Sequence, residues 1–483
     1  MNLPLDSTAW ALAALHAVLG ISTSVHALLK VRDPRAAWGW IAACLLAPIA
    51  GPLLYLLLGT NQVNPKAQRV HRAGDDAASP ELVALLPGVL AEELRELVRI
   101  GGAMTGRPLV PGNGIDVLHS GEQAYPAMLA AIAAARSRVW LASYIFSGRG
   151  IGADFVTALT AAQRRGVDVR VLVDAVGDLY YFPRASTLLL DAGIPTRRFQ
   201  LARRFVPLPH LNLRNHRKLL IVDDGLAFTG GMNISDHTVL GKPSAALVDL
   251  HFRLRGPVAG QLASAFDDDW HDSGGGLTSA RERALEWAPE PPSAAMPAAS
   301  GNSHCRTITA GPNEGVERLE LVLQAALANA HHRVCIMTPY FIPMPELARG
   351  LEAAALRGVN VELILPARSN LRWVDWASRR WQRDLLAHGV RIHLRPGPFA
   401  HAKLLVVDDY YSHIGSANLD PRSLRLNFEL VVETYCKRLA GELSQHFDAV
   451  RSSCQPRTAA DLESASALVR VRDALCWLFS PYL

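Results

Sequence analysis

Two stretches of the chain carry the same polar residues at the same spacing. They read "NHRKLLIVDDGLAFTGGMN" over 215–233 and "AHAKLLVVDDYYSHIGSAN" over 400–418. In each, a lysine follows a histidine by two residues, and an asparagine follows that histidine by seventeen. A chance match in residue type and in both spacings is improbable. The shared positions are His216, Lys218, Gly231 and Asn233 in the first stretch and His401, Lys403, Ser416 and Asn418 in the second.

Each stretch is typical of a β-hairpin. In the first, an apolar run over 219–222 precedes the turn signal "DDG", and a returning strand follows over 226–229. Side chains alternate along a strand, so the histidine and the lysine point to the same face. The returning strand brings the glycines and the asparagine back to that end. Each hairpin therefore gathers an imidazole, an ammonium group, a carboxamide and glycine amides at one place.

This set of groups suits phosphodiester chemistry. Lysines, asparagines and glycine amides stabilise the negative charge of a phosphoryl transition state. One imidazole can attack phosphorus while the other protonates the leaving oxygen. Neither a carboxylate cluster nor a Cys/His metal-ligand spacing accompanies the stretches, so we expect catalysis without a metal ion or cofactor.

Four acidic residues complete the candidate set. Asp223 and Asp408 stand at the hairpin turns; we include them with the catalytic residues, although capping of the turns alone would explain them. Asp249 in "LVDLHF" and Glu429 in "NFELVV" begin late strands of the two repeats. Either could orient an imidazole through its second ring nitrogen.

The repeat extends beyond the hairpins. "AAQRRGVDVRVLVDA" at 161–175 aligns without gaps to "AAALRGVNVELILPA" at 353–367, with seven of fifteen residues identical. Each half alternates helices with nearly continuous apolar strands, which predicts an α/β sheet covered on both faces. Duplication implies a pseudo-twofold axis, at which the two hairpins can meet and form one site.

The N-terminus predicts membrane insertion. Residues 9–29 and 36–58 lack Asp, Glu, Lys and Arg over 21 and 23 residues, each enough to cross a hydrocarbon core of about 30 Å. A cleaved signal peptide is disfavoured, because no basic residue precedes the first stretch and a second follows at once. A buried helical hairpin in a soluble protein is the alternative. We expect a multi-pass membrane protein with its body facing the cytoplasm, although basic residues flank both ends of the second stretch.

Composition limits the partners. The net charge is only +5, so no basic domain of the nucleic-acid-binding type stands out. The six cysteines form no disulfide framework, which favours a reducing compartment. The expected organisation is a helical hairpin at 1–60, a connecting segment at 61–107, a first domain at 108–272, a linker at 273–304, a second domain at 305–455 and an amphipathic tail at 456–483.

The two H-x-K-x4-D-x6-G-[GS]-x-N motifs resemble those of the phospholipase D superfamily. The longer stretches "LNLRNHRKLLIVDDGLAFTGGMNISD", "TPYFIP" and "IGSANLDPRSLRLNFEL" are similar to the bacterial cardiolipin synthases, as are the N-terminal stretch and the ending "VRDALCWLFSPYL". The resemblance implies two duplicated phospholipase D-like α/β sandwich domains behind a two-helix transmembrane hairpin. It covers nearly the whole chain except the middle linker.

The resemblance also implies a reaction. Two phosphatidylglycerol molecules would give cardiolipin and glycerol, with His216 as the nucleophile and His401 as the general acid and base. Lys218, Lys403, Asn233 and Asn418 match phosphate-binding positions. Gly231 stands where the second motif has Ser416, which makes the site asymmetric. Phosphatidylglycerol and other anionic membrane lipids are the expected partners, and nucleic acid is not.

Three other functions share these residues or part of them. A phospholipase would use the same site with water as the acceptor, and acceptor choice depends on pocket shape and water exclusion. A nuclease would cut nucleic-acid diesters, but the membrane hairpin and modest charge argue against it. A non-enzymatic membrane scaffold is disfavoured because both motifs are intact.

Overall fold

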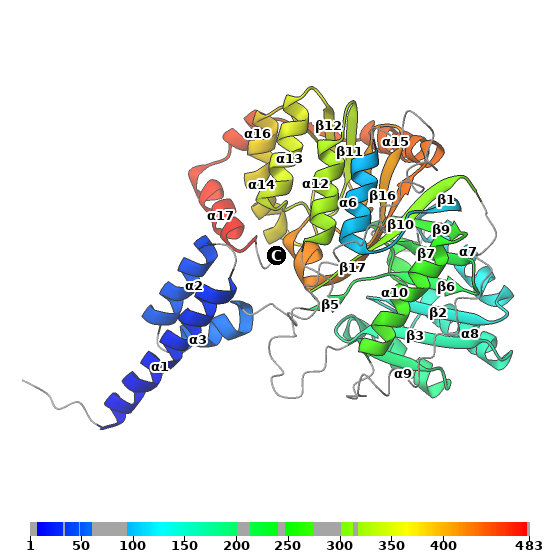
Figure 1. The fold of residues 1–483 in the computed structure, drawn as a ribbon, viewed down its shortest axis with the longest axis horizontal. Helices are drawn as coiled ribbons and strands as arrows, with labels where there is room; N and C mark the ends of the chain where they lie inside the picture. Colours follow the sequence, from blue (N-terminus) through cyan, green and yellow to red (C-terminus); the bar gives the residue numbers. More distant parts are fainter. Residues whose placement is uncertain are drawn as a thin grey trace, which may run out of the picture. The chain divides into compact units, whose positions relative to one another are not determined.

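The computed structural model describes residues 7–31, 34–47, 49–59, 94–199, 213–239, 247–273, 301–312 and 317–480. The chain divides into two compact units. One contains the helices within residues 7–59, and the other contains the described residues from 94 to 480 (Figure 1).

The first unit is a bundle of apolar helices. Its elements are α1 (Ser7–Lys30), α2 (Pro34–Leu46), α3 (Ala50–Leu54) and the π-helical turn η1 (Tyr55–Gly59). His26 Nδ1 lies 2.7 Å from the hydroxyl of Tyr55, and Ala27, Cys44 and Tyr55 are buried together. Among the described residues, Ala9–Lys30 is the one helix long and apolar enough to cross a membrane.

The second apolar stretch differs from the prediction of a single helix over 36–58. The helix α2 ends at Leu46, and the chain continues as the separate short elements α3 and η1. The sequence carries Pro48 and Pro52 in this stretch. Proline lacks the backbone N–H that a helix interior needs, which accounts for an interruption here.

The second unit is built from two copies of one α/β pattern. The first copy comprises β1 (Val110–His119), α7 (Ser120–Ala134), β2 (Arg138–Ser143), α8 (Ile151–Arg164), β3 (Asp168–Asp174), η4 (Gly177–Leu179), α9 (Ala185–Asp191), β4 (Thr196–Phe199), β5 (Arg214–Asn215), β6 (Leu219–Val222), β7 (Leu226–Gly230), η6 (Asp236–Thr238), β8 (Leu247–Val248), β9 (Leu250–Arg255) and α10 (Val258–Asp272). The second comprises β10 (Ser303–Ala310), α12 (Arg318–Ala328), β11 (Arg333–Met337), α13 (Pro345–Leu356), β12 (Asn360–Pro366), α14 (Arg372–Ala387), β13 (Arg391–Arg395), β14 (Phe399–Ala400), β15 (Leu404–Val407), β16 (Tyr411–Gly415), η7 (Arg422–Leu426), β17 (Asn427–Tyr435), α15 (Lys437–Arg451) and β18 (Gln455–Arg457). The helices α16 (Ala459–Glu463) and α17 (Ala467–Leu478) follow.

One 16-stranded sheet joins the two copies. The strand order is β18-β13-β12-β11-β15-β16-β17-β10-β1-β9-β7-β6-β2-β3-β4, with β5 paired to β17 off this path. Read outward from the central antiparallel pair β1 and β10, the two halves repeat the same order. This symmetry confirms the predicted duplication.

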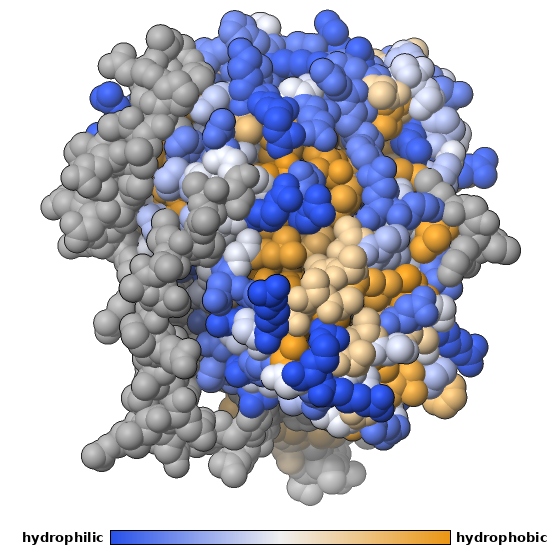
Figure 2. All heavy atoms as spheres, turned by 90° about the vertical axis from the view of Figure 1, so that its right-hand side faces the viewer, coloured by the Kyte–Doolittle hydropathy of each residue, from blue (hydrophilic) through white to orange (hydrophobic). Residues whose placement is uncertain are grey.

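Helices cover both faces of the sheet, as the apolar strands predicted. The helices α7, α8 and α9 pack on one face of the first half, and α6 (Arg95–Thr105), α12 and α13 pack on one face of the second (Figure 1). A shared core between the halves contains Phe266 and Trp270 of α10 and Phe447 of α15. Full burial of such a side chain contributes about 1.5–3 kcal/mol. On the face shown in Figure 2, hydrophilic side chains surround a central apolar area.

The predicted connections carry more structure than expected. The helix α6 falls within the connecting segment at 61–107, yet Leu97 and Val98 are buried in the core of the second half. Arg306 Nη2 donates to Val98 O at 3.0 Å. Most of the predicted linker at 273–304 lies outside the described residues, and β10 already begins at Ser303.

Candidate active site

The two hairpins form as predicted. β6 pairs antiparallel with β7 and β15 with β16, so Leu219 faces Thr229 and Leu404 faces Ile414. Lys218 and Lys403 immediately precede these strands, on the same end as Gly231 and Ser416. Both lysines are buried, and both histidine side chains are only 12% exposed.

The backbone of each histidine is hydrogen-bonded to the opposite half of the molecule. The short strand β5, just before His216, runs parallel to β17 of the second half, and His216 N donates to Phe428 O at 2.9 Å. The strand β14, just before His401, runs parallel to β8 of the first half, and His401 N donates to Val248 O at 2.8 Å. The hairpins therefore meet at the pseudo-twofold axis and form a single site.

The two predicted orienting acids lie in this site, and each contacts the histidine of the other half. His216 Nδ1 lies 2.9 Å from Glu429 Oε1, and His401 Nδ1 lies 2.7 Å from Asp249 Oδ2. Both carboxylates are fully buried. An N–H at Nδ1 that donates to a carboxylate places the lone pair of the imidazole on Nε2. In His401 this atom lies 3.1 Å from Lys403 Nζ.

Burial and neighbouring cations set the protonation of the imidazoles. The pKa of His216 is held well below its usual value, mainly by burial and then by the nearby charges of Lys218, Lys403 and His401. Burial and Lys403 also lower the pKa of His401, against the opposing charge of Asp249. Both shifts favour the neutral imidazole, which is the form that a nucleophile requires.

The lysines and Glu429 are shifted by the same burial. Burial lowers the pKa of Lys403 to about 8, against Asp249 and Glu429, and moves that of Lys218 well below its usual value. Burial raises the pKa of Glu429 to about 7, although Lys218 and Ser416 oppose the shift. Each lysine Nζ donates to the backbone oxygen of its own histidine, at 2.7 Å in the first half and 2.6 Å in the second. A bound phosphate would supply the negative charge that this group of cations lacks.

The remaining predicted phosphate ligands differ between the halves. Asn233 Oδ1 accepts from Ile145 N at 3.2 Å, whereas Asn418 Oδ1 is buried with no hydrogen-bond partner among the described residues. Ser416 Oγ donates to Glu429 Oε2 at 2.5 Å. No equivalent hydroxyl fits at Gly231, because a Cβ there would lie 2.4 Å from Asp249 Oδ1.

The structure does not bring Asp223 and Asp408 into the site, although the sequence-based set included them. They stand at the opposite ends of β6 and β15, with left-handed backbones at φ of 52° and 54°. Asp223 Oδ1 accepts from Ser137 N at 2.7 Å, and Asp408 Oδ1 accepts from Arg333 N at 2.8 Å. Burial would raise the pKa of Asp223, but hydrogen bonds from Ser137 and Arg138 outweigh it and lower that pKa. These carboxylates cap the segments before β2 and β11.

Sequence reasoning missed a buried support beneath His216. Arg217 Nη1 donates to Asp269 Oδ1 at 2.7 Å, and Asn215 Nδ2 donates to Asp269 Oδ2 at 3.0 Å. Asp174 Oδ2 accepts from Asn215 N at 2.9 Å. An Asp at the end of an apolar strand and an Asp inside an amphipathic helix were the only signals in the sequence. These contacts hold the residues on either side of His216.

Aromatic side chains border both histidines. The ring of Tyr144 lies 5.1 Å from that of His216 and 6.2 Å from Tyr180. The ring of Phe399 lies 6.2 Å from His401. Tyr180 and Phe182 are 60% and 80% exposed. Among the described residues, no group of three or more His, Cys, Asp or Glu side chains is arranged to hold a metal ion.

Comparison with known proteins identifies the family. Residues 128–270 and 323–451 match the family "Cardiolipin synthase, PLD-like domain", and residues 9–59 match "Phospholipase_D-nuclease N-terminal". The chain belongs to the phospholipase D-like cardiolipin synthase family.

Curated relatives match along almost their whole length. The chain is 28% identical to a cardiolipin synthase of Oceanobacillus iheyensis, over 98% of this chain and 99% of that protein. It is 30% identical to cardiolipin synthase A of Pseudomonas aeruginosa, over 96% of this chain and 94% of that protein. The crystal structure of a phosphatidylserine synthase from Haemophilus influenzae has the same fold, with a TM-score of 0.62 and 15% identity over 80% of this chain and all of that one.

Proposed function

We propose that this chain is a membrane phosphatidyltransferase that makes cardiolipin and glycerol from two phosphatidylglycerol molecules. The observation that carries the proposal is the crosswise pairing of His216 with Glu429 and of His401 with Asp249. Two imidazoles, each oriented by a carboxylate and flanked by a buried lysine, suit a two-step displacement at phosphorus in which one attacks and the other transfers a proton. Similarity to cardiolipin synthases over nearly the whole chain supports the choice of lipid.

In the first step, His216 Nε2 attacks the phosphorus of one phosphatidylglycerol. The bond from phosphorus to the glycerol oxygen breaks, and that oxygen takes a proton from His401. The products are free glycerol and a phosphatidyl group on His216. The substrate phosphate and Asp249 both favour the protonated form of His401, which offsets the effect of its burial on the pKa.

In the second step, a glycerol hydroxyl of another phosphatidylglycerol gives its proton to His401 and attacks the same phosphorus. The bond from phosphorus to His216 breaks, which releases cardiolipin and restores both imidazoles. Lys218, Lys403, Asn233 and Asn418 hold the non-bridging oxygens, where they stabilise charge that grows in each transition state.

The aromatic border favours a lipid substrate over nucleic acid. Tyr144 links His216 to the exposed ring of Tyr180, and Leu179 and Phe182 are exposed beside it. A rim of exposed apolar side chains next to a phosphate-binding site matches a molecule that joins a phosphodiester to acyl chains.

The deciding experiment supplies purified protein in detergent with phosphatidylglycerol alone. We expect cardiolipin and glycerol in equal amounts, and no loss of turnover when a chelator is added. Phosphatidic acid as the sole product, at every concentration of added acceptor, would make the protein a phospholipase. Loss of activity with a chelator and its recovery with a divalent metal would contradict the metal-free mechanism.

The membrane arrangement is a further part of the proposal. Membrane association follows from the apolar helix α1 and the family. We place both N-terminal segments in the bacterial inner membrane and the body in the cytoplasm, where unpaired thiols persist. All six cysteines are unpaired in the structure. Labelling of single-cysteine variants in intact cells with a membrane-impermeant thiol reagent tests this: a body cysteine that reacts without lysis would reverse the orientation.

Glu429→Gln tests the charge beside His216. The pKa of Glu429 is raised to about 7, so its carboxylate loses its charge as the pH falls through that value. Below pH 7 the group no longer stabilises the positive charge that develops on His216. We expect wild-type turnover to fall on the acid side of pH 7. The variant should be at least about 10-fold slower and lack that pH dependence.

The matched control for this variant is Glu442→Gln, the same chemical change on the exposed surface of α15. It should keep the wild-type profile. If turnover of the Glu429 variant still fell on the acid side of pH 7, that fall would be due to the titration of another group.

Gly231→Ala tests the asymmetry of the two motifs. The new Cβ would lie 2.4 Å from Asp249 Oδ1, so the carboxylate must move away from His401. Displacement of about 1 Å lowers rates by about 10²-fold, and we expect a loss of that order in turnover. Ser416→Gly at the equivalent position removes the hydroxyl that donates to Glu429 Oε2 and accepts from Leu430 N, hydrogen bonds worth about 1 kcal/mol each, and should reduce turnover less. Steady-state kinetics of both variants make the comparison, and equal losses would show that the steric argument is wrong.

A further inference from the structure

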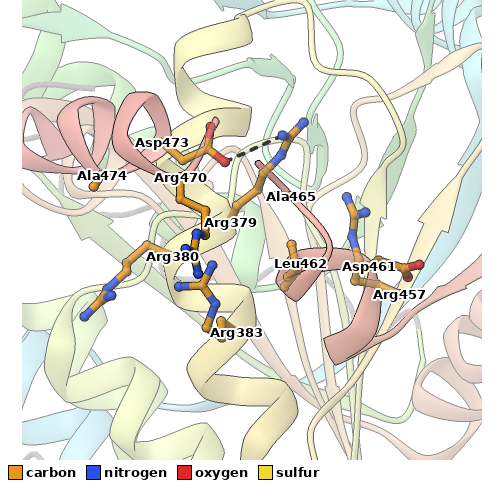
Figure 3. A pocket seen from close by; sticks show the side chains of 10 residues that line it. All are labelled: Arg379, Arg380, Arg383, Arg457, Asp461, Leu462, Ala465, Arg470, Asp473 and Ala474. Atoms are coloured by element: carbon orange, nitrogen blue, oxygen red, sulfur yellow. Dashed lines mark ion pairs between the residues drawn. The ribbon is translucent and has the colours of Figure 1, made fainter. Parts of the chain in front are cut away.

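An arginine-rich pocket lies in the second half of the body, between α14, α16, α17 and the strand β18 (Figure 3). Its volume is about 150 Å³. The residues that line it are Arg379, Arg380, Arg383, Arg457, Asp461, Leu462, Ala465, Arg470, Asp473 and Ala474. None of them belongs to the proposed catalytic set.

The positive charge of this pocket exceeds its negative charge. Arg379 pairs with Asp473 at 3.6 Å and with Asp375 at 3.4 Å, and Asp461 accepts from Thr458 N at 2.7 Å. Within the described parts of the chain, Arg383 and Arg470 have no carboxylate partner, and Figure 3 shows their side chains pointing toward one another. Two guanidinium groups placed this way attract a shared anion, since they repel each other otherwise.

The helix α17 beside the pocket has two apolar faces, and the described parts of the chain cover only one of them. Cys476 and Trp477 pack against Val374 and Ala377 of α14, and Arg472 lies over the ring of Trp376 at 4.2 Å. A second row remains exposed by 54 to 84% of each side chain: Leu468, Val471, Leu475, Leu478 and Phe479. An exposed apolar row beside clustered arginines is typical of a helix that lies in a membrane interface.

We propose that the arginine pocket binds the phosphate headgroup of an anionic membrane phospholipid, while the exposed row of α17 enters the acyl-chain region. The headgroup bridges Arg383 and Arg470, which supplies the negative charge that the pocket lacks. Basic residues near an anionic surface contribute about 1 kcal/mol each, so the site discriminates charged from zwitterionic lipid. This second lipid site is independent of the proposed reaction.

The test uses the full-length chain with His216→Ala, so that lipid is not consumed. Amide hydrogen exchange is measured at residues 467–479 in nanodiscs of phosphatidylcholine, with and without phosphatidylglycerol. We expect phosphatidylglycerol to slow exchange by at least about fivefold. The additional changes Arg383→Glu and Arg470→Glu should remove that protection. Arg164→Glu, on the exposed surface of α8, should leave it intact.

Unchanged exchange at β11 and β12 verifies that the variants are folded; if the glutamates disturb the fold, glutamines at the same two positions replace them. Equal protection by phosphatidylcholine alone would reduce α17 to an apolar anchor without headgroup recognition. Equal protection of detergent-solubilised protein by inorganic phosphate would make the pocket a site for free anions. Protection that survives both arginine replacements would also overturn the proposal.

Discussion

His216→Ala is expected to abolish turnover of phosphatidylglycerol, and His401→Ala is expected to slow it by about 10²–10⁴-fold. The first variant loses the atom that bonds to phosphorus. The second keeps that atom but leaves the glycerol oxygen without a proton donor. A phosphatidyl ester of nitrophenol needs no proton to leave, so it should partly restore formation of the intermediate in the His401 variant and not in the His216 variant.

The position of the trapped phosphate provides the decisive measurement. Peptide mass spectrometry of the His401 variant should find the phosphatidyl group on His216. If the phosphatidyl group were found on His401 in the His216→Ala variant, and not on His216 in the His401→Ala variant, the two histidines would have exchanged roles. The class of reaction would remain the same. Rescue of both variants by the nitrophenyl ester would contradict the covalent step.

Asp269→Ala is expected to cause the largest loss of stability. The pair between Arg217 and Asp269 is buried, with 1% and 5% of the side chains exposed. Removal of the aspartate leaves a guanidinium charge in the interior, which lowers the free energy of unfolding by about 3–5 kcal/mol. The variant should also lose activity, because Asn215 and Arg217 flank His216. The apparent melting temperature in detergent and the turnover rate measure both effects.

Two control variants separate charge burial from simple loss of a contact. Asp268→Ala, at the preceding position of α10, removes an exposed partner of Arg107 and should change stability by no more than about 1 kcal/mol. Arg217→Met combined with Asp269→Leu removes both charges and should recover most of the stability lost by Asp269→Ala. If Asp269→Ala and Asp268→Ala had the same apparent melting temperature, the buried pair would not contribute to the stability of the protein.

Local features of the site could be read from the sequence. The hairpins β6–β7 and β15–β16 formed at the predicted residues, since an apolar run, a two-aspartate turn and a return strand specify their own pairing. The duplication was visible in the aligned helices and strands, and the sheet repeats its order about β1 and β10. Each lysine lies close to its histidine, although both residues stand in the short segment before the strand rather than in the strand itself.

Other features were predicted wrongly because two structural interpretations fit the same residues. Asp223 and Asp408 belong to the recurrent motif, but they stand at the turn ends of the hairpins, where their carboxylates bind backbone amides of the segments before β2 and β11. Hydropathy counted residues 36–58 as one membrane helix, although the prolines within that stretch interrupt the helical hydrogen bonds. A recurrent motif does not show which groups its side chains contact. Mean hydropathy does not show whether the backbone hydrogen bonds of a helix continue through an apolar stretch.

The sequence by itself determined the chemistry available to this protein, through two His/Lys/Asn hairpins, and the α/β pattern that carries them. Only the tertiary structure decided which acid serves which histidine. His216 and Glu429 are 213 residues apart, and they meet because two-residue strands of each half pair with the other half. The same holds for the arginines of α14 and α17, which face one pocket only after α17 packs on α14. Hairpin contacts are specified by neighbouring residues, whereas these contacts exist only once the whole sheet has assembled.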